Sequence, residues 1–71
     1  MLKPGDLIKD DSDGEIGLVV SAGPGFVVNE CEDYPEGAMP SWKVIWPSMS
    51  DVCDLGEDAM TSGLVKIISK A

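Results

Sequence analysis

The chain has 71 residues, of which 44% are hydrophobic, and its 13 acidic residues against five lysines give a formal net charge of −8. This length allows one domain, residues 1–71, and the hydrophobic fraction is too high for a disordered tail. The sequence contains no arginine and no histidine, so the usual phosphate ligand and the usual near-neutral proton shuttle are both missing. The composition therefore argues against nucleic-acid binding and against histidine-based catalysis.

The N-terminal sequence and the cysteines indicate a protein that no signal peptide exports. Met1 to Asp6 contains proline and glycine where a signal peptide needs an apolar region. No apolar run approaches the roughly 20 residues that cross a bilayer. Cys31 and Cys53 form no C-x-x-C pair, so we interpret both as free thiols in a reducing compartment, with a single disulfide between them as the alternative.

Glycine and proline interrupt the chain at short intervals, and short β-branched runs lie between them. The runs are Leu7 to Ile8, Ile16 to Val20, Phe26 to Val28, Val44 to Trp46 and Leu64 to Ile68. This spacing predicts an all-β domain of five to six antiparallel strands. The Asp13-Gly14 dipeptide predicts a β-hairpin between the first two runs. We also expect a short edge strand within residues 51–55 and one helical turn within residues 56–61.

The alternation of side chains along the strands predicts the core. Trp42, Val44 and Trp46 share one face of their strand, which places both indoles together. We expect one indole in the core and the other partly exposed beside Tyr34 and Met39, in a binding surface. The expected core contains Leu7, Ile16, Leu18, Val20, Val44, Trp46, Leu55, Val65 and Ile67.

Residues 29–41 form the least regular stretch, with four acidic residues and two prolines. We expect an acidic inserted loop here, because a long irregular connection in a small domain is often functional. The candidate partner-binding residues are Glu30, Glu32, Asp33, Tyr34, Glu36, Met39 and Trp42.

No motif in the chain indicates catalysis or a metal. The acidic residues from Asp10 to Glu15 resemble part of an EF-hand loop, but alignment on Gly14 puts Lys9 at the first ligand position and Val20 at the twelfth. We therefore interpret this cluster as a solvated turn. Carboxylate pairs alone do not indicate a hydrolase, and no histidine is present to activate a serine or cysteine. We expect a non-enzymatic protein without a cofactor.

Four segments of the chain together resemble a group of small SH3-like β-barrel proteins that tailed bacteriophages encode, including phages of marine and cyanobacterial hosts. The segments are Lys3 to Lys9, Asp13 to Val20, Trp42 to Trp46 and Leu64 to Ile68. The resemblance implies an SH3-like barrel, and residues 23–41 are an insertion relative to the pattern of the group. It also implies a phage protein of the virion or the host cytoplasm.

Together, these observations predict a non-enzymatic protein-interaction module, either a structural or decorating component of a virion or a protein that binds a host protein. The alternative is an acidic inhibitor that mimics DNA and blocks a basic nucleic-acid-binding site, because complementary charges steer such partners together. A net charge of −8 is also ordinary for a soluble small domain. We expect no direct binding to nucleic acid or membrane. Strand edges such as Phe26 to Val28 would let copies of the chain pair into a homo-oligomer.

Overall fold

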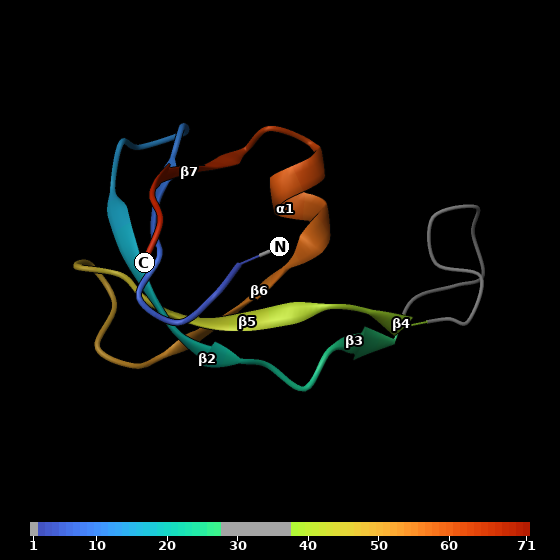
Figure 1. Cartoon of the computed structure of the whole chain (residues 1–71). Coiled ribbons are helices and arrows are strands. Elements are labelled where there is room, and N and C mark those ends of the chain that lie inside the picture. The colour runs from blue at the N-terminus through green and yellow to red at the C-terminus, as the bar shows by residue number, and fades with distance from the viewer. Residues whose placement is uncertain (1, 28–37) are drawn as a thin grey trace.

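A computed structural model describes residues 2–27 and 38–71 of the chain (Figure 1). Of these residues, 48% lie in strands and 8% in a helix, which confirms the predicted mostly β character. The elements are β1 (Leu7–Asp10), β2 (Ile16–Ala22), β3 (Phe26–Val27), β4 (Ala38–Met39), β5 (Ser41–Ile45), β6 (Cys53–Gly56), α1 (Glu57–Thr61) and β7 (Val65–Ser69). The described residues include no helix that is long and apolar enough to cross a membrane.

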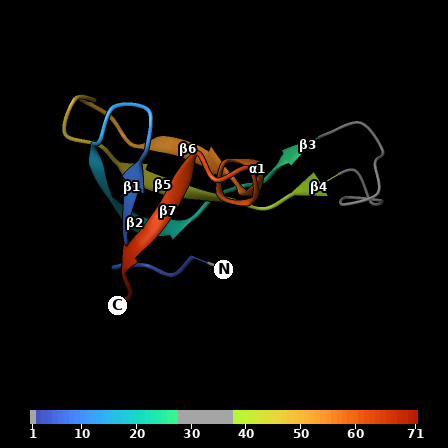
Figure 2. The same cartoon turned by 90° about the horizontal axis from the view of Figure 1, so that it is seen from above.

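Five strands form one antiparallel sheet in the order β6-β5-β2-β1-β7, and β3 pairs with β4 in a separate two-stranded sheet. Figure 2 shows the larger sheet curling so that β7 crosses over β5 and β6. Its edge strands, β6 and β7, do not pair with each other among the described residues, so the closed barrel of the prediction was wrong. The short helix α1 connects and contacts both edge strands, so it lies where further strand pairing would close the sheet (Figure 1).

The predicted hairpin at the first turn is confirmed, because β1 and β2 pair with Ile8 opposite Gly17. Gly14 has a φ of 78°, the left-handed conformation that glycine adopts without a steric penalty. Its amide donates to the carbonyl of Asp10 at 2.7 Å and closes the turn.

The face of β2 that points into the core is the opposite of the predicted one. Val19 is fully buried, whereas Ile16 and Leu18 are exposed. The buried core consists of Leu2, Ile8, Val19, Trp42, Val44 and Val65, with Trp46, Leu55, Ala59, Met60 and Ile67 packed against it. The predictions of core positions for Val44, Leu55, Val65 and Ile67 therefore agree with the structure, whereas Trp46 packs against the core but stays half buried. Those for Ile16 and Leu18 were wrong, and Leu7 and Val20 are only half buried.

Gly17 explains this reversal. A Cβ atom at this position would lie 2.8 Å from Cε3 of Trp46 and 2.8 Å from Cγ1 of Val44, so the space beside Gly17 is already filled by side chains from β5 and its end. The face of β2 that carries Gly17 is therefore the one that points into the core, because the indole of Trp46 occupies the volume that a side chain at this position would need. Val19 shares that face by alternation, and Ile16 and Leu18 turn outward.

Two register shifts interrupt the sheet. Between Val19 and Ser21, β2 has one extra residue, Val20, relative to β5. Ile68 is the extra residue of β7 opposite Leu7. Such irregularities increase the local twist and bend a strand, which fits the curl of this sheet.

The predicted loop over residues 29–41 was partly wrong, because Ala38 and Met39 form β4 and Ser41 begins β5. Pairing of Phe26 with Met39 gives this short segment its strand structure. The rest of the predicted loop lies outside the described residues.

Asp6 is the one buried acidic residue in the described part of the chain, with 2% of its surface exposed. Its Oδ2 atom accepts the backbone N–H of Lys3 at 2.9 Å, and its Oδ1 atom accepts that of Ala71 at 2.8 Å. Its own carbonyl accepts the N–H of Val19 at 3.0 Å. One residue therefore joins the segment before β1, the strand β2 and the segment after β7.

We expect Gly17→Ala to lower the free energy of unfolding by about 1 to 3 kcal/mol, because the added methyl group overpacks the core against Trp46 and Val44. Chemical denaturation followed by circular dichroism measures the change. Gly14→Asn is the control, since the space around Gly14 is open and asparagine adopts the left-handed conformation readily. A Gly17→Ala variant as stable as the wild type would contradict the packing described here.

The hydrogen bonds from Ala71 and Lys3 hold the pKa of Asp6 below its usual value of 3.8, against the opposing effect of burial. The folded chain therefore binds this proton less readily than the unfolded chain. The stabilisation is fully present above pH 3.8 and is lost as the pH falls through the lower, folded pKa. Asparagine has no carboxyl group to titrate. We therefore expect the free energy of unfolding of Asp6→Asn to be lower than that of the wild type at neutral pH, but to fall less steeply as the pH drops below 3.8.

Denaturation curves at a series of acidic pH values measure this slope. Asp58→Asn removes an exposed carboxylate from α1 and serves as the matched control. Equal slopes in Asp6→Asn and the wild type would show that the buried carboxylate does not control acid stability.

Candidate protein-interaction site

The structure describes two of the seven predicted partner-binding residues. Met39 is 8% exposed and Trp42 is 5% exposed, so neither side chain has the partial exposure that we expected, and their role in partner binding stays a prediction. Trp42 belongs to the core, and the Cε atom of Met39 lies close to Gly56. The other five residues lie outside the described part of the chain, and their role stays a prediction. They are Glu30, Glu32, Asp33, Tyr34 and Glu36.

The partly exposed indole is Trp46, the reverse of the expected division between the two tryptophans. It borders an open cavity of about 280 Å³ at the end of the sheet where the β1–β2 turn meets the turn after β5. The cavity is lined by Asp10, Asp13, Glu15, Trp46, Ser48, Met49 and Cys53. We call this set the acidic pocket.

Hydrogen bonds within and between two turns orient two carboxylates of the acidic pocket. Glu15 accepts the backbone N–H of Ser48 at 2.8 Å and its hydroxyl at 2.7 Å, which links the two turns that form the pocket. Asp13 accepts the N–H of Glu15 at 2.9 Å. Because backbone donors hold them, these carboxylates lose little conformational freedom when a ligand binds.

Asp10, the third carboxylate, accepts the hydroxyl of Ser12 at 2.6 Å and its backbone N–H at 2.8 Å. These hydrogen bonds, the hydroxyl first, hold the pKa of Asp10 below its usual value of 3.8. Asp10 is therefore ionised throughout the physiological pH range.

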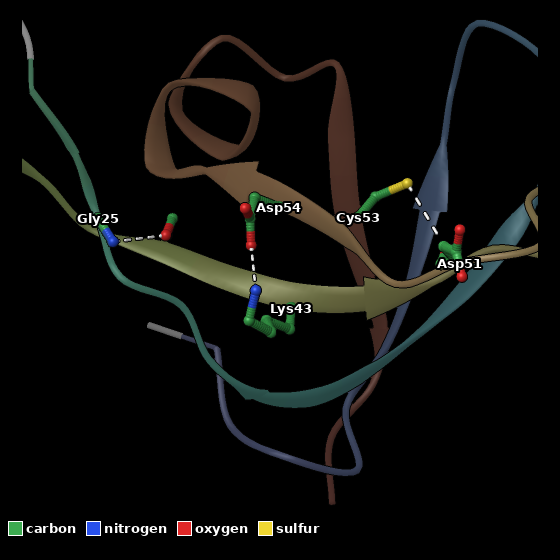
Figure 3. A network of polar contacts seen from close by, with 6 residues as sticks. Gly25, Lys43, Asp51, Cys53 and Asp54 are labelled. Carbon is green, nitrogen blue, oxygen red and sulfur yellow. Dashed lines mark hydrogen bonds and ion pairs between the residues drawn. The ribbon is translucent and has the colours of Figure 1, made fainter.

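The acidic pocket keeps its negative charge within the described structure. Two ion pairs are present among the described residues. One joins Lys43 to Asp54 at 2.9 Å (Figure 3), and the other joins Lys66 to Asp11 at 3.1 Å. Neither pair uses a carboxylate of the pocket. No three His, Cys, Asp or Glu side chains among residues 2–27 and 38–71 lie close enough to hold one metal ion.

This arrangement suits a cationic organic group. A guanidinium or ammonium group is attracted by carboxylates and by the face of an indole, and it is large enough to interact with groups too widely spaced for one metal ion. The sequence alone showed the three carboxylates and Trp46, but we interpreted the acidic residues as a solvated turn. The sequence gives no sign that the β1–β2 turn contacts the segment after β5, because this contact exists only in the tertiary structure.

Cys53 lies at the edge of the acidic pocket as a free thiol. Its Sγ atom donates to the carbonyl of Asp51 at 3.8 Å (Figure 3). Cys31, with which an alternative disulfide was considered, lies outside the described residues.

Another cavity, of about 210 Å³, lies between α1 and the core and is bordered by Trp42. Its lining is mainly apolar and comes from Leu2, Trp42, Glu57, Met60, Thr61 and Ile67. With one acidic side chain in its lining, it offers a less specific set of groups than the acidic pocket.

No protein-family model, curated protein or solved structure matches this chain.

We expect the two indoles to differ in fluorescence quenching. Trp42→Phe leaves Trp46 as the fluorophore beside three carboxylates, and caesium ions should quench it more strongly than iodide ions. Trp46→Phe leaves the buried Trp42, which both ions should quench weakly. Stern–Volmer slopes measure the effect, and an iodide slope equal to the caesium slope in Trp42→Phe would contradict a negative pocket at Trp46.

Proposed function

We propose that this protein is a non-enzymatic interaction module of SH3-like architecture that binds a basic surface of a partner protein through the acidic pocket. The observation that supports it best is the convergence of Asp10, Asp13 and Glu15 around the half-buried Trp46. An arginine or lysine side chain of the partner fills the pocket, with its charge against the carboxylates and its stem against the indole.

The strand order β6-β5-β2-β1-β7 and the helical turn before the last strand support the SH3-like part of this proposal. The phage origin rests on the sequence resemblance. On that basis the partner is a virion protein, and this chain is a structural or decorating component, or the partner is a protein of the infected host.

An acidic inhibitor that blocks a basic nucleic-acid-binding site is the second candidate function. The grouping of three carboxylates without a lysine in the lining of the pocket favours it, because such a group can occupy a site that binds phosphates. The two functions differ in the partner. A decorating protein is recovered from purified capsids at fixed stoichiometry, whereas an inhibitor prevents its partner from binding DNA.

The test of this proposal has two steps. The partner is first isolated by affinity capture on the immobilised chain, and its affinity for the chain is then measured as a function of salt concentration. We expect Asp10→Asn combined with Asp13→Asn to weaken binding at least tenfold, about 1.4 kcal/mol, at low salt. Asparagine still accepts the hydrogen bonds of both turns, so the variant removes charge while keeping the local geometry.

Asp51→Asn combined with Asp58→Asn is the matched control, because it removes the same charge from exposed positions outside the lining of the pocket. The affinity of the wild type should also fall as salt rises past about 0.1 M, where the Debye length is about 10 Å. Equal losses in the two double variants would show that only overall charge matters, and the acidic pocket would then not be the binding site.

A further inference from the structure

The Asp13-Gly14 dipeptide of the β1–β2 turn is a chemically reactive sequence as well as a turn sequence. The backbone nitrogen of the residue after an aspartate attacks the side-chain carboxyl carbon, which closes a five-membered succinimide ring. Glycine hinders this attack least, because it has no side chain. Asp13 is the only aspartate in the sequence that glycine follows, and both residues are exposed to solvent.

The reaction needs no reagent other than water. When the ring closes, the nitrogen loses its proton and the carboxyl group loses its hydroxyl, which together leave as water. Water then opens the ring at either carbonyl. Opening at the former side-chain carbonyl restores aspartate, whereas opening at the main-chain carbonyl gives isoaspartate, in which the main chain runs through Cβ and Cγ and the α-carboxyl group is free. Isoaspartate has the same mass and charge but adds one carbon atom to the main chain.

The folded turn engages both reacting groups of this dipeptide. The N–H of Gly14 donates to the carbonyl of Asp10 at 2.7 Å. The Oδ1 atom of Asp13 accepts the N–H of Glu15 at 2.9 Å, so the carboxylate is bound to the residue beyond the glycine. Ring closure requires the nitrogen to give up its proton and the carboxyl group to turn toward that nitrogen. Both hydrogen bonds therefore break before the ring forms.

Contacts with distant parts of the chain keep this turn closed. The carboxylate of Glu15 accepts the backbone N–H of Ser48 at 2.8 Å and its hydroxyl at 2.7 Å. The N–H of Asp11 donates to the carbonyl of Leu64 at 2.9 Å. An unfolded chain lacks these contacts, so the protection of the dipeptide depends on the tertiary structure.

We propose that Asp13 is a modification site at which isoaspartate forms spontaneously, and that the contact between Glu15 and Ser48 sets the rate by keeping the turn closed. The reaction proceeds from the open turn, so its rate follows the population of that state. The product cannot close the turn in the same way, because the added main-chain carbon lies between the residues that the hydrogen bond from Gly14 to Asp10 joins.

The modification changes the acidic pocket, because Asp13 is part of its lining. Isoaspartate moves one of the three carboxylates and alters the turn that carries the other two. The modified chain should therefore bind a basic partner more weakly, which makes the reaction a one-way loss of binding with time. This effect on binding rests on the proposed function, whereas the rate of modification does not.

Incubation of the full chain at neutral pH, folded in buffer or unfolded in guanidinium chloride, tests the protection. Chromatographic peptide mapping separates the aspartyl and isoaspartyl peptides of equal mass. Isoaspartate at Asp13 should form at least about tenfold more slowly in the folded chain, a difference of about 1.4 kcal/mol. Asp13→Glu should remove the signal from the unfolded chain, because the corresponding six-membered ring closes much more slowly. Equal rates in the folded and unfolded chains, or no isoaspartate at this position in either, would overturn the proposal.

Two further variants test the role of the contact between the turns. Glu15→Ala removes both hydrogen bonds to Ser48 but keeps the backbone N–H that binds Asp13, and it should raise the rate in the folded chain at least about threefold. Val44→Ala is the control, because it leaves a cavity in the core and lowers the stability of the whole domain without removing a contact of the turn.

Circular dichroism verifies that both variants fold, and their rates in guanidinium chloride should equal that of the wild type. An unchanged rate in folded Glu15→Ala would show that the contact with Ser48 does not control the reaction. An equal increase in Val44→Ala would show that the reaction proceeds from the globally unfolded chain, and the proposed opening of the turn would then be wrong.

Discussion

The carboxylate of Asp6 is the contact on which the arrangement of the sheet depends. It is the buried charge of the described structure, and it is stabilised by backbone N–H groups from residues 3 and 71. Burial of a carboxylate without hydrogen-bond donors would lower the stability of the fold. Loss of either donor would leave the charge of Asp6 partly unsatisfied, and this penalty holds the segments around residues 3 and 71 in place. The main chain of the same residue binds Val19 of β2, and thus one position fixes the entry to β1 and the segment after β7 against the centre of the sheet.

Much of this fold can be predicted from local sequence. The hairpin follows from Asp13-Gly14, and most strands follow from β-branched runs between glycines and prolines, because both signals depend on backbone conformation within a few residues. The inward face of β2 could not be predicted in this way. Ile16, Leu18 and Val20 form a more hydrophobic set than Gly17 and Val19, and only the position of the Trp46 ring, 29 residues after Gly17, makes the glycine face the inner one.

The candidate site has the same dependence on distant residues. Its carboxylates are visible in the sequence as a turn, but their relation to Trp46 depends on the contact between Glu15 and Ser48, which joins two turns across the end of the sheet. Trp42 and Trp46 have the same alternation along their strand, so sequence could not decide which indole reaches the surface. The closed core around Leu2 and Val65 covers Trp42, whereas Trp46 lies at the open end.

The two register shifts have a consequence for how the length of this chain can vary. A single deletion within a regular strand moves every later side chain to the opposite face of the sheet, which in β2 would exchange the buried face of Gly17 and Val19 for the exposed face of Ile16 and Leu18. Val20 and Ile68 differ, because each is an extra residue opposite a single partner on the neighbouring strand. Loss of either residue would restore regular alternation and leave the flanking side chains on their present faces. Within the sheet, Val20 and Ile68 are therefore the positions where one residue can be lost without turning the core side chains outward. Such a deletion would make the sheet straighter and less curled.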